Sequence, residues 1–252
     1  MMRAITLVDL DDTLFQTLRK CPSDVPFEQL TPLGFKADGT PISYATPQQM
    51  AFIRLLSETT YLVPVTARSF EALRRVRLDF TQAVCAHGGM ILGEDGTVDS
   101  GWDAEIRAQA TLHETNIKRL AEALSLAAKA TTLPINVRVQ MEGDIGLYPL
   151  ARHENADEAA LNRVADVVSD QLPADWTDHR NSNAVAFLPP FLGKQHAVAR
   201  MLPGLRARFP NAVVIGIGDS ISDAPFMDLC DFAMTPTTSQ LARAARSGLF
   251  SE

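Results

Sequence analysis

The sequence predicts an α/β protein in which a parallel sheet forms the core and an inserted α+β unit divides that core. Two apolar runs, residues 4–8 and 212–217, have the length and composition of buried strands. Helix-like and strand-like segments alternate after the first run, as they do in a parallel sheet, and the alternation is interrupted once before it resumes. We therefore expect a discontinuous core, residues 1–87 and 189–252, and an inserted domain, residues 88–188.

The first half of the predicted core alternates strands with helices. We expect a helix over residues 47–58, a strand over 61–66, a helix over 69–79 and a strand over 83–86. Pro64 has no backbone N–H to donate, so we also expect a bulge or irregular pairing within its strand.

A segment rich in proline and glycine, residues 22–44, separates the first strand from the first helix. Within it, Asp38-Gly39 lies between two strand-like segments, and this dipeptide is typical of a tight hairpin turn. We expect this hairpin to act as a flap over the carboxyl end of the first strand.

The inserted domain has the pattern of a second, smaller α+β unit. We expect helices over residues 103–129 and 156–171, with strands over 135–141, 146–150, 176–179 and 184–188. The core then resumes with a helix from Gly193-Lys194 to about residue 209, a strand over 213–217, a short helix over 224–229, a strand near 232–234 and a last helix after Thr238.

Charge and cysteine content exclude several classes of function. The chain of 252 residues has 23 basic and 30 acidic side chains and a net charge of −7. No basic field attracts nucleic acid or anionic lipid, so we expect neither nucleic acid nor a membrane as a partner. Cys21, Cys85 and Cys230 are isolated, which disfavours a disulfide framework or a zinc site and is typical of a cytoplasmic protein. No apolar stretch has the length of a membrane span or of a secretory signal.

Acidic residues follow both apolar runs. Asp9, Asp11 and Asp12 follow the first run, and Asp219 and Asp223 follow the second. Because ligands bind at the carboxyl ends of parallel strands, we expect these carboxylates to meet in one crevice. Their mutual repulsion predicts a hard cation with oxygen ligands, and Mg²⁺ together with a substrate phosphate is the common case.

Four motifs, in order along the chain, resemble those of the haloacid dehalogenase (HAD) superfamily, and specifically of its phosphatases. They are Asp9-Leu10-Asp11-Asp12-Thr13, Thr66 with Arg68, Lys194, and Gly218-Asp219 with Asp223. The insertion between the second and third motifs resembles a C2-type cap of the C2B kind, as in Cof-like and sucrose-phosphatase-like members. The resemblance implies a Rossmann-like core with a parallel sheet, a C2-type cap domain and Mg²⁺-dependent phosphatase activity.

The resemblance also implies a role for each motif. Asp9 would attack phosphorus to form an aspartyl phosphate, which splits hydrolysis into two easier steps, and Asp11 would carry the proton in both steps. Thr66 and Lys194 would stabilise the transferring phosphoryl group, and Arg68 would contact phosphate. The implied metal ligands are Asp9, the backbone carbonyl of Asp11, Asp219 and Asp223.

Substrate choice in this superfamily comes mainly from the cap. Polar residues of the predicted cap sheet are therefore candidates for recognising a hydroxyl-rich or anionic ligand: Arg138, Arg152, His179, Arg180, Asn181 and Asn183. Of these we take Arg180 and Asn181, together with Arg68 of the core, as the substrate-binding residues. An ordinary solvated face is the alternative for each of these residues.

The sequence thus favours a Mg²⁺-dependent phosphomonoester hydrolase that acts on a small phosphorylated metabolite, such as a sugar or polyol phosphate. The alternative among enzymes is a phosphomutase, because phosphomannomutase-like proteins share this core and cap type. A receiver-type phospho-switch also combines acidic residues, a threonine and a lysine on a parallel sheet. Receivers, however, have about half this length and no large insertion.

Overall fold

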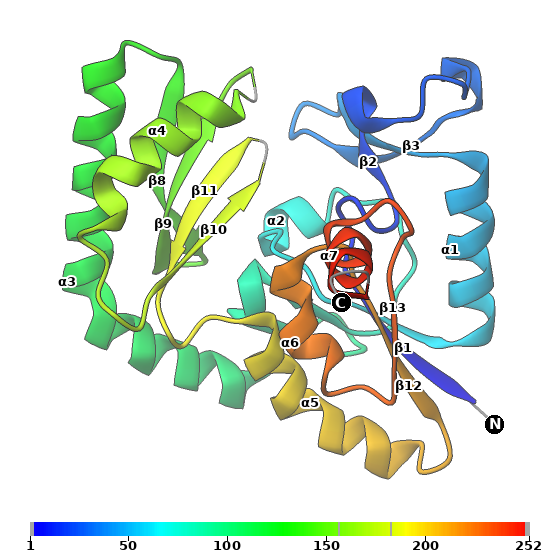
Figure 1. The fold of residues 1–252 in the computed structure, drawn as a ribbon. Coiled ribbons are helices and arrows are strands. Elements are labelled where there is room, and N and C mark those ends of the chain that lie inside the picture. Colours follow the sequence, from blue (N-terminus) through cyan, green and yellow to red (C-terminus); the bar gives the residue numbers. More distant parts are fainter. Residues whose placement is uncertain (1–2, 156, 182, 250–252) are drawn as a thin grey trace. The chain divides into compact units, whose positions relative to one another are not determined.

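The structure, a computed structural model, describes residues 3–155, 157–181 and 183–249. The chain forms two compact units, drawn in Figure 1. Unit 1 comprises Met1–Asp99 and Lys194–Glu252, and unit 2 comprises Ser100–Gly193.

The limits of these units differ from those expected for the core and the inserted domain. Strand β7 (Met90–Leu92) pairs antiparallel with β6 (Ala83–Cys85), and this pairing keeps the segment up to residue 99 in unit 1. At the other limit, the ring of Phe191 packs against His113 of unit 2, with 5.4 Å between the ring centroids. Unit 2 therefore begins and ends later in the chain than the predicted 88–188.

A parallel sheet forms the centre of unit 1. Its strands, in spatial order, are β13 (Phe232–Met234), β12 (Val213–Ile217), β1 (Ala4–Val8) and β5 (Tyr61–Pro64). The parallel register pairs Val8 of β1 with Ile217 on one side and with Pro64 on the other. The residues that follow these three strands therefore emerge at the same edge of the sheet, although they are far apart in the sequence.

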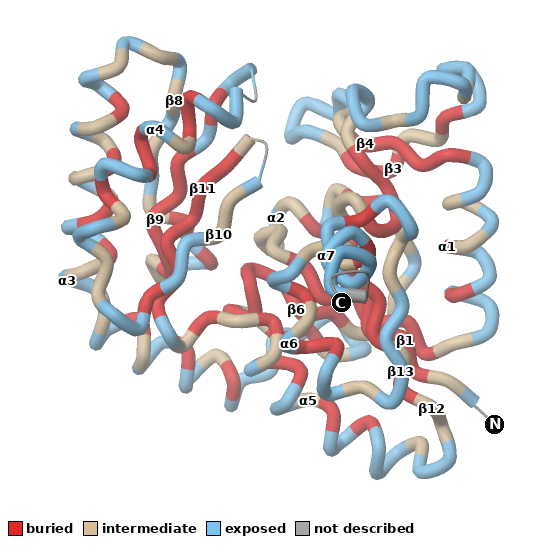
Figure 2. The backbone as a smooth tube through the Cα atoms, viewed as in Figure 1, coloured by how far each residue is buried: buried red, intermediate tan, exposed pale blue. Residues whose placement is uncertain are grey.

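The interior of unit 1 is apolar and centred on β1. Ile5 and Leu7 have no exposed surface, and Figure 2 shows β1 as part of the buried backbone. Helix α1 (Pro47–Thr59) packs its apolar face on this core. It begins at a capping box, in which Thr46 accepts a hydrogen bond from the backbone N–H of Gln49 and the Gln49 side chain accepts one in return.

An antiparallel sheet of three short strands follows β1 in the sequence. Strand β4 (Pro41–Ala45) lies between β2 (Gln16–Thr17) and β3 (Thr31–Phe35). The hairpin turn predicted at Asp38-Gly39 is confirmed, because Gly39 has a φ of +81° between β3 and β4. Glycine adopts this left-handed conformation without the steric cost that other residues have.

The helix predicted over residues 69–79 is wrong in length, because α2 comprises only Phe70–Leu73. After α2 the chain runs beside β3. The backbone N–H of Arg77 donates to the carbonyl of Leu33 at 2.8 Å, and a second backbone bond joins Phe35 to the same segment. Pairing with the hairpin thus outweighs the helical periodicity of this segment.

The irregular strand pairing predicted at Pro64 is also wrong. Strands β1 and β5 pair in continuous register up to Val8 and Pro64. The N–H of Val65 donates to the carbonyl of Val8 at 2.7 Å, so the nitrogen of Pro64 faces the opposite side of the strand. On that side the chain meets the neighbouring segment through an isolated bridge between Val65 and Val84. The absence of a backbone N–H at Pro64 therefore removes no hydrogen bond to β1.

The longest of the remaining elements of unit 1 is α5 (Lys194–Arg208). The others are η1 (Leu18–Lys20), η2 (Phe27–Gln29), η3 (Ala86–Gly88), η4 (Ile221–Asp223), α6 (Ala224–Met227) and α7 (Gln240–Leu249). Within the described ranges, none of the helices has both the length and the apolar character that crossing a membrane requires.

Unit 2 is an α+β unit, as predicted for the insertion. Its antiparallel sheet has the order β10 (Thr177–Asn181), β11 (Ala184–Leu188), β9 (Ile145–His153) and β8 (Ile135–Glu142). Helices α3 (Ser100–Thr131) and α4 (Glu158–Ser169) pack on the sheet. Leu120, Leu124 and Phe187 are fully buried in the core between helices and sheet.

Candidate active site

Asp9 follows β1 directly and is buried at the carboxyl edge of the parallel sheet. Its backbone N–H donates to the carbonyl of Ile217 at 2.8 Å, which continues the pairing with β12 by one residue. The carbonyl of Leu10 then accepts a hydrogen bond from the N–H of Leu14 at 2.9 Å, so the chain turns here. Strand pairing before Asp9 and this turn after it fix the carboxylate at the sheet edge, where the residue is 5 % exposed.

Lys194, the first residue of α5, brings a buried positive charge to Asp9. Its Nζ lies 2.6 Å from Oδ1 of Asp9 and 2.6 Å from Oδ1 of Asp223. Burial opposes the charge of the ammonium group, but the two carboxylates outweigh burial and raise the pKa of Lys194 above its ordinary value. Lys194 is therefore a permanently charged cation between two carboxylates.

Asp223 is fully buried and accepts several hydrogen bonds. Its Oδ2 accepts from the N–H of Asp219 at 3.2 Å and from the N–H and hydroxyl of Ser220 at 3.0 and 2.7 Å. Burial opposes ionisation, but Lys194 and the Ser220 hydrogen bonds outweigh it and lower the pKa of Asp223. A Cβ at Gly218 would lie 2.5 Å from the Cβ of Asp223, so glycine allows this close approach.

Two other carboxylates of the cluster are costly to ionise. Burial, followed by the negative charges of Asp223 and Asp12, raises the pKa of Asp219 to about 6. Burial also raises the pKa of Asp9 well above its ordinary value, and the charge of Asp223 adds to this effect although Lys194 opposes it. The cluster therefore holds more negative charge than its one lysine offsets.

Asp9, Asp219 and Asp223 together fit a divalent cation. Each offers one carboxylate oxygen, and these oxygens lie within 4.8 Å of one another. Oxygen ligands of this kind suit a hard cation such as Mg²⁺. A bound cation would also offset the negative charge that raises the pKa values of Asp9 and Asp219.

Asp11 is held by a different cation, Arg68. Nε of Arg68 donates to Oδ2 of Asp11 and Nη2 donates to Oδ1, both at 2.7 Å, which is a bidentate pair. The Asp11 side chain is 47 % exposed, whereas that of Arg68 is 12 % exposed. The guanidinium, for which the sequence predicted a phosphate contact, is thus paired with the predicted proton carrier.

Thr66 lies at the end of the strand next to β1. Its backbone N–H donates to the carbonyl of Val84 at 2.8 Å, and its hydroxyl accepts a hydrogen bond from the backbone N–H of Arg68 at 3.1 Å. Thr66 is 1 % exposed. One turn therefore positions Thr66 and Arg68 together at the carboxyl edge of the sheet.

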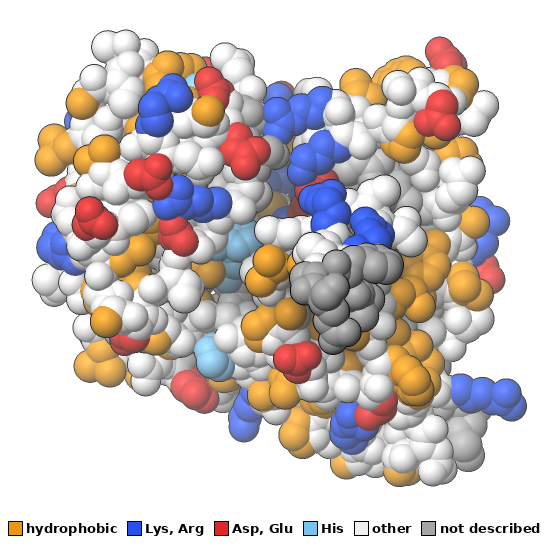
Figure 3. Space-filling view, in the orientation of Figure 1, with side chains coloured by type: hydrophobic (Ala, Val, Ile, Leu, Met, Phe, Trp, Pro, Cys, Tyr) orange, Lys and Arg blue, Asp and Glu red, His pale blue; other side chains and the backbone are white. Residues whose placement is uncertain are grey.

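Two of the three predicted substrate-binding residues, Arg180 and Asn181, lie in unit 2 and have partners there. Arg180 bonds Asp178 and Asp166 at 2.7 Å and the hydroxyl of Ser169 at 3.1 Å. The side-chain oxygen Oδ1 of Asn181 accepts hydrogen bonds from backbone N–H groups at the turn before β11. Figure 3 shows basic and acidic side chains intermingled on the visible face of unit 2. Both residues thus have structural contacts, and their contact with substrate stays a prediction.

Sequence reasoning missed two hydroxyl groups of the site. The hydroxyl of Thr13 lies 3.2 Å from Oδ2 of Asp9 and 3.3 Å from Oδ1 of Asp219, so it bridges two carboxylates. Its place four residues after Asp9 is a signal that was available in the sequence. The hydroxyl of Ser43 accepts a hydrogen bond from Nη2 of Arg68 at 3.2 Å, and no local sequence pattern points to it.

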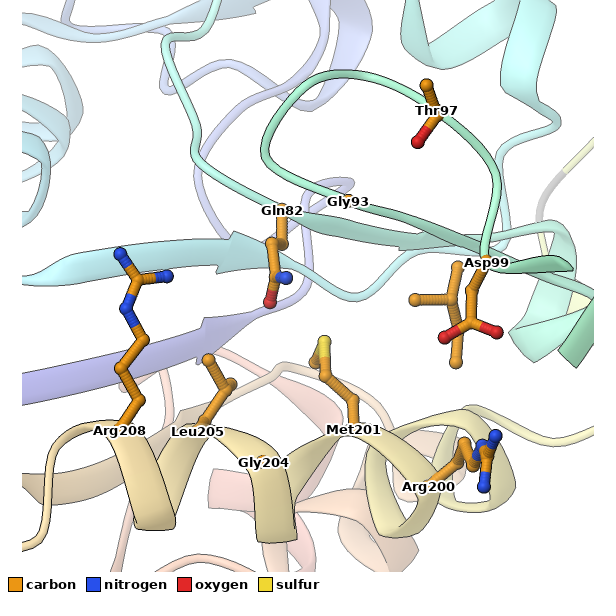
Figure 4. Close-up of a pocket in the computed structure, with 10 residues that line it drawn as sticks. Gln82, Gly93, Thr97, Asp99, Arg200, Met201, Gly204, Leu205 and Arg208 are labelled. Carbon is orange, nitrogen blue, oxygen red and sulfur yellow. The ribbon is translucent and has the colours of Figure 1, made fainter. Parts of the chain in front are cut away.

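A hollow of unit 1, of about 370 Å³, lies between α5 and the β6–β7 hairpin (Figure 4). Met201 and Leu205 form an apolar wall on the α5 side, with Gln82 opposite. Arg208 at one end is already paired with Glu94. Because its polar groups do not include the carboxylate cluster, the Asp9 cluster remains the candidate for catalysis.

Neither the protein-family models nor the curated proteins include a match to this chain. Solved structures do match it. Sucrose-phosphatase from Synechocystis sp. PCC6803, in complex with sucrose and phosphate, matches with a TM-score of 0.54 and 14% identity over 100% of this chain and 90% of that one.

Two further structures give similar values. The C-terminal domain of C. albicans trehalose-6-phosphate phosphatase matches with a TM-score of 0.58 and 13% identity over 90% of this chain and 73% of that one. N-terminally truncated IMP-nucleotidase from Plasmodium falciparum matches with a TM-score of 0.53 and 13% identity over 99% and 71% of the two chains. At such low identity the likeness concerns the fold. The chain thus shares its fold with these three solved structures, and this is the fold that its four motifs predict.

Proposed function

We propose that this chain is a metal-dependent phosphomonoesterase. The observation that carries the proposal is the buried cluster at the carboxyl ends of β1 and β12, where Lys194 lies 2.6 Å from both Asp9 and Asp223 and Asp219 lies beside them. A carboxylate nucleophile beside a fixed cation is suited to an electrophile that itself carries negative charge. Phosphatases that share the fold support the same activity.

The proposed reaction has two displacements at phosphorus. In the first, a carboxylate oxygen of Asp9 bonds to phosphorus, the bond to the ester oxygen breaks with its electron pair, and protonated Asp11 gives its proton to that oxygen. In the second, water attacks the aspartyl phosphate, Asp11 takes a proton from the water, and the Asp9 carboxylate leaves. Lys194 and the hydroxyl of Thr66 stabilise charge on the phosphoryl oxygens in both steps.

We propose Mg²⁺ as the cation, held by Asp9, Asp219 and Asp223 with the backbone carbonyl of Asp11. The three carboxylates support this assignment because their oxygens lie within 4.8 Å of one another and two of them have raised pKa values. When bound, the ion would supply positive charge that lets an anionic ester approach anionic carboxylates.

We propose that the substrate is a sugar or polyol phosphate and that cap residues such as Arg180 and Asn181 recognise it. Two structures that share the fold are named for sugar phosphates, a sucrose-phosphatase and a trehalose-6-phosphate phosphatase. A third is named for a nucleotide, so nucleoside monophosphates belong among the compounds to be tested. The isolated cysteines, which are free thiols in the structure, support a cytoplasmic setting.

Release of inorganic phosphate tests the proposal. The purified full chain is incubated with sugar 6-phosphates, glycerol phosphate, nucleoside monophosphates and p-nitrophenyl phosphate, with Mg²⁺ or with a chelator. We expect turnover that requires Mg²⁺ and that falls by about 10³-fold or more in Asp9→Asn, since the nucleophile is lost. The matched control is Asp24→Asn, an exposed carboxylate of unit 1, which should retain full activity.

Two results would count against the proposal. Turnover that persists in Asp9→Asn or in chelator would exclude the mechanism. A wild type that releases no phosphate from any ester would exclude hydrolysis of those esters. Interconversion of two sugar phosphates without phosphate release would identify the phosphomutase alternative.

A further inference from the structure

The guanidinium of Arg68 lies in a cradle built from separate segments of unit 1. It holds Asp11 through two hydrogen bonds of 2.7 Å. Its Nη2 also donates to the hydroxyl of Ser43, in β4, at 3.2 Å. The guanidinium carbon lies 5.2 Å from the centroid of the Phe15 ring. Arg68 is therefore held by an ion pair, a hydrogen bond to a neutral hydroxyl and an aromatic ring at once.

Gly34 of β3 leaves the space that this cradle needs. The register of β3 and β4 shifts on both sides of Gly34, and a bulge of this kind re-aims the side chains around it. A Cβ at Gly34 would lie 3.0 Å from the Cβ of Ser43, 3.1 Å from its hydroxyl oxygen and 3.4 Å from Nη2 of Arg68. A larger residue at this position would push the hydroxyl or the guanidinium aside.

The β3–β4 hairpin is tied to the segment that follows Arg68 in the chain. Gly34 forms a β-bridge with Val76, and the N–H of Arg77 donates to the carbonyl of Leu33 at 2.8 Å. Ser43 itself is 1 % exposed. The backbone hydrogen bonds of the hairpin thus fix the position of the hydroxyl that contacts Arg68. A change in the conformation of the hairpin would therefore move the guanidinium.

We propose that Ser43 and Gly34 are positioning residues for proton transfer. They fix Arg68, and Arg68 fixes the Asp11 carboxylate for the second step, in which that carboxylate takes a proton from the attacking water. This inference rests on the proposed function. A half-exposed carboxylate without such a clamp would sample several rotamers, and misplacement of a catalytic group lowers the rate. The hairpin then acts on catalysis without contacting the substrate.

A double-mutant cycle with p-nitrophenyl phosphate tests this inference. The aryloxide leaves without protonation, so kcat reports the step in which Asp11 is the base. We expect Ser43→Ala to lower kcat by about 3- to 10-fold, which corresponds to the typical contribution of one hydrogen bond, with KM changed less than about twofold. In an Asp11→Asn background the same substitution should change kcat by less than about 1.5-fold.

Gly34→Ala should reproduce the loss of kcat, because its Cβ occupies the cradle. Two control variants lie outside the cradle. Thr40→Ala removes an exposed hydroxyl at the tip of the same hairpin, and Gly204→Ala adds a Cβ that meets nothing within 4 Å. Both should keep the kcat of the wild type. The inference would be overturned if Ser43→Ala lowered kcat equally in the wild-type and the Asp11→Asn backgrounds. It would also be overturned if Ser43→Ala changed KM alone.

A second cycle, read by urea unfolding, does not depend on activity. Ser43→Ala and Arg68→Met each break the contact of 3.2 Å, so the double variant should lose less stability than the two single losses combined. If the losses of unfolding free energy in the two single variants add strictly in the double variant, the contact between Ser43 and Arg68 contributes nothing to stability. This result would overturn the inference even if the enzyme is active. An inactive wild type with clear coupling would instead refute the proposed function and leave the cradle intact.

Discussion

Replacement of Lys194 by methionine should destabilise the protein strongly and in a pH-dependent way. Nζ lies 2.6 Å from a carboxylate oxygen of Asp9 and of Asp223, and all three side chains are 8 % exposed or less. Methionine has a similar length and no charge, so it removes the cation without opening a large cavity. Two buried carboxylates then face each other without the charge that offsets them.

The structure sets the size and the sign of this effect. Loss of one partner from a buried ion pair costs about 3–5 kcal/mol at pH 7, because the other charge stays buried. Burial already raises the pKa of Asp9, and loss of Lys194 raises it further. When folding raises the pKa of an acid, that acid stabilises the folded state at pH values below its pKa in the unfolded chain. This stabilisation is lost as pH rises through the pKa of the folded state. The loss of unfolding free energy caused by Lys194→Met should therefore be smaller at pH 5 than at pH 8, by about 1 kcal/mol or more.

Urea unfolding of wild type and Lys194→Met in chelator at pH 5, 6, 7 and 8 measures this penalty. The control is Lys118→Met, because the Lys118 side chain is 66 % exposed and pairs with Glu114 on the surface of α3. That substitution should cost less than about 0.5 kcal/mol at every pH. A Lys194→Met penalty below about 1 kcal/mol, or one that is equal at pH 5 and pH 8, would refute the electrostatic reasoning.

Three further predictions concern metal binding, the missed hydroxyl and the core of unit 2. Mg²⁺ affinity, measured by calorimetry, should rise as pH rises through about 6. The reason is that the pKa of Asp219 is raised to about 6 and a protonated carboxyl group binds metal poorly. An affinity that stays constant from pH 5 to 8 would contradict this prediction. Thr13→Val should lower the unfolding free energy by about 1–2 kcal/mol, since the hydroxyl loses a buried contact to Asp9 and a partly buried contact to Asp219. An unchanged urea midpoint would argue against these contacts. Leu120→Ala should cost about 2–5 kcal/mol because Leu120 is fully buried, whereas Leu126→Ala, at a side chain 68 % exposed, should cost less than about 0.5 kcal/mol; equal losses would contradict the packing of α3.

The sequence was most informative where local pattern and tertiary structure agree. The apolar run of β1 and the acidic residues after it predicted a strand that ends at a site, and Asp9 lies at the edge of the parallel sheet. Asp38-Gly39 predicted a turn from local conformation alone, and the positive φ of Gly39 confirms it. These features depend on residues close together in the chain, so a single sequence can reveal them.

Predictions failed where a distant segment decides the local structure. The helix expected over 69–79 ends at Leu73, because the residues beyond it pair with β3. Ser43 gave no signal, since its partner Arg68 lies in another segment of the chain. The guanidinium of Arg180 pairs with Asp166 of α4, a partner that the sequence did not indicate, and its contact with substrate stays a prediction. Long-range pairing and charge partners of this kind leave no periodic pattern in the sequence.

In the proposed mechanism Asp9 carries the phosphoryl group during turnover. The most direct test is to quench the wild type in acid during steady-state turnover of its best substrate with Mg²⁺, and to analyse the peptide that contains Asp9 by mass spectrometry. We expect one phosphoryl group on Asp9, which disappears when the substrate is exhausted. Phosphate release by a protein whose Asp9 stays unmodified, with the phosphoryl group on another residue or on none, would contradict it.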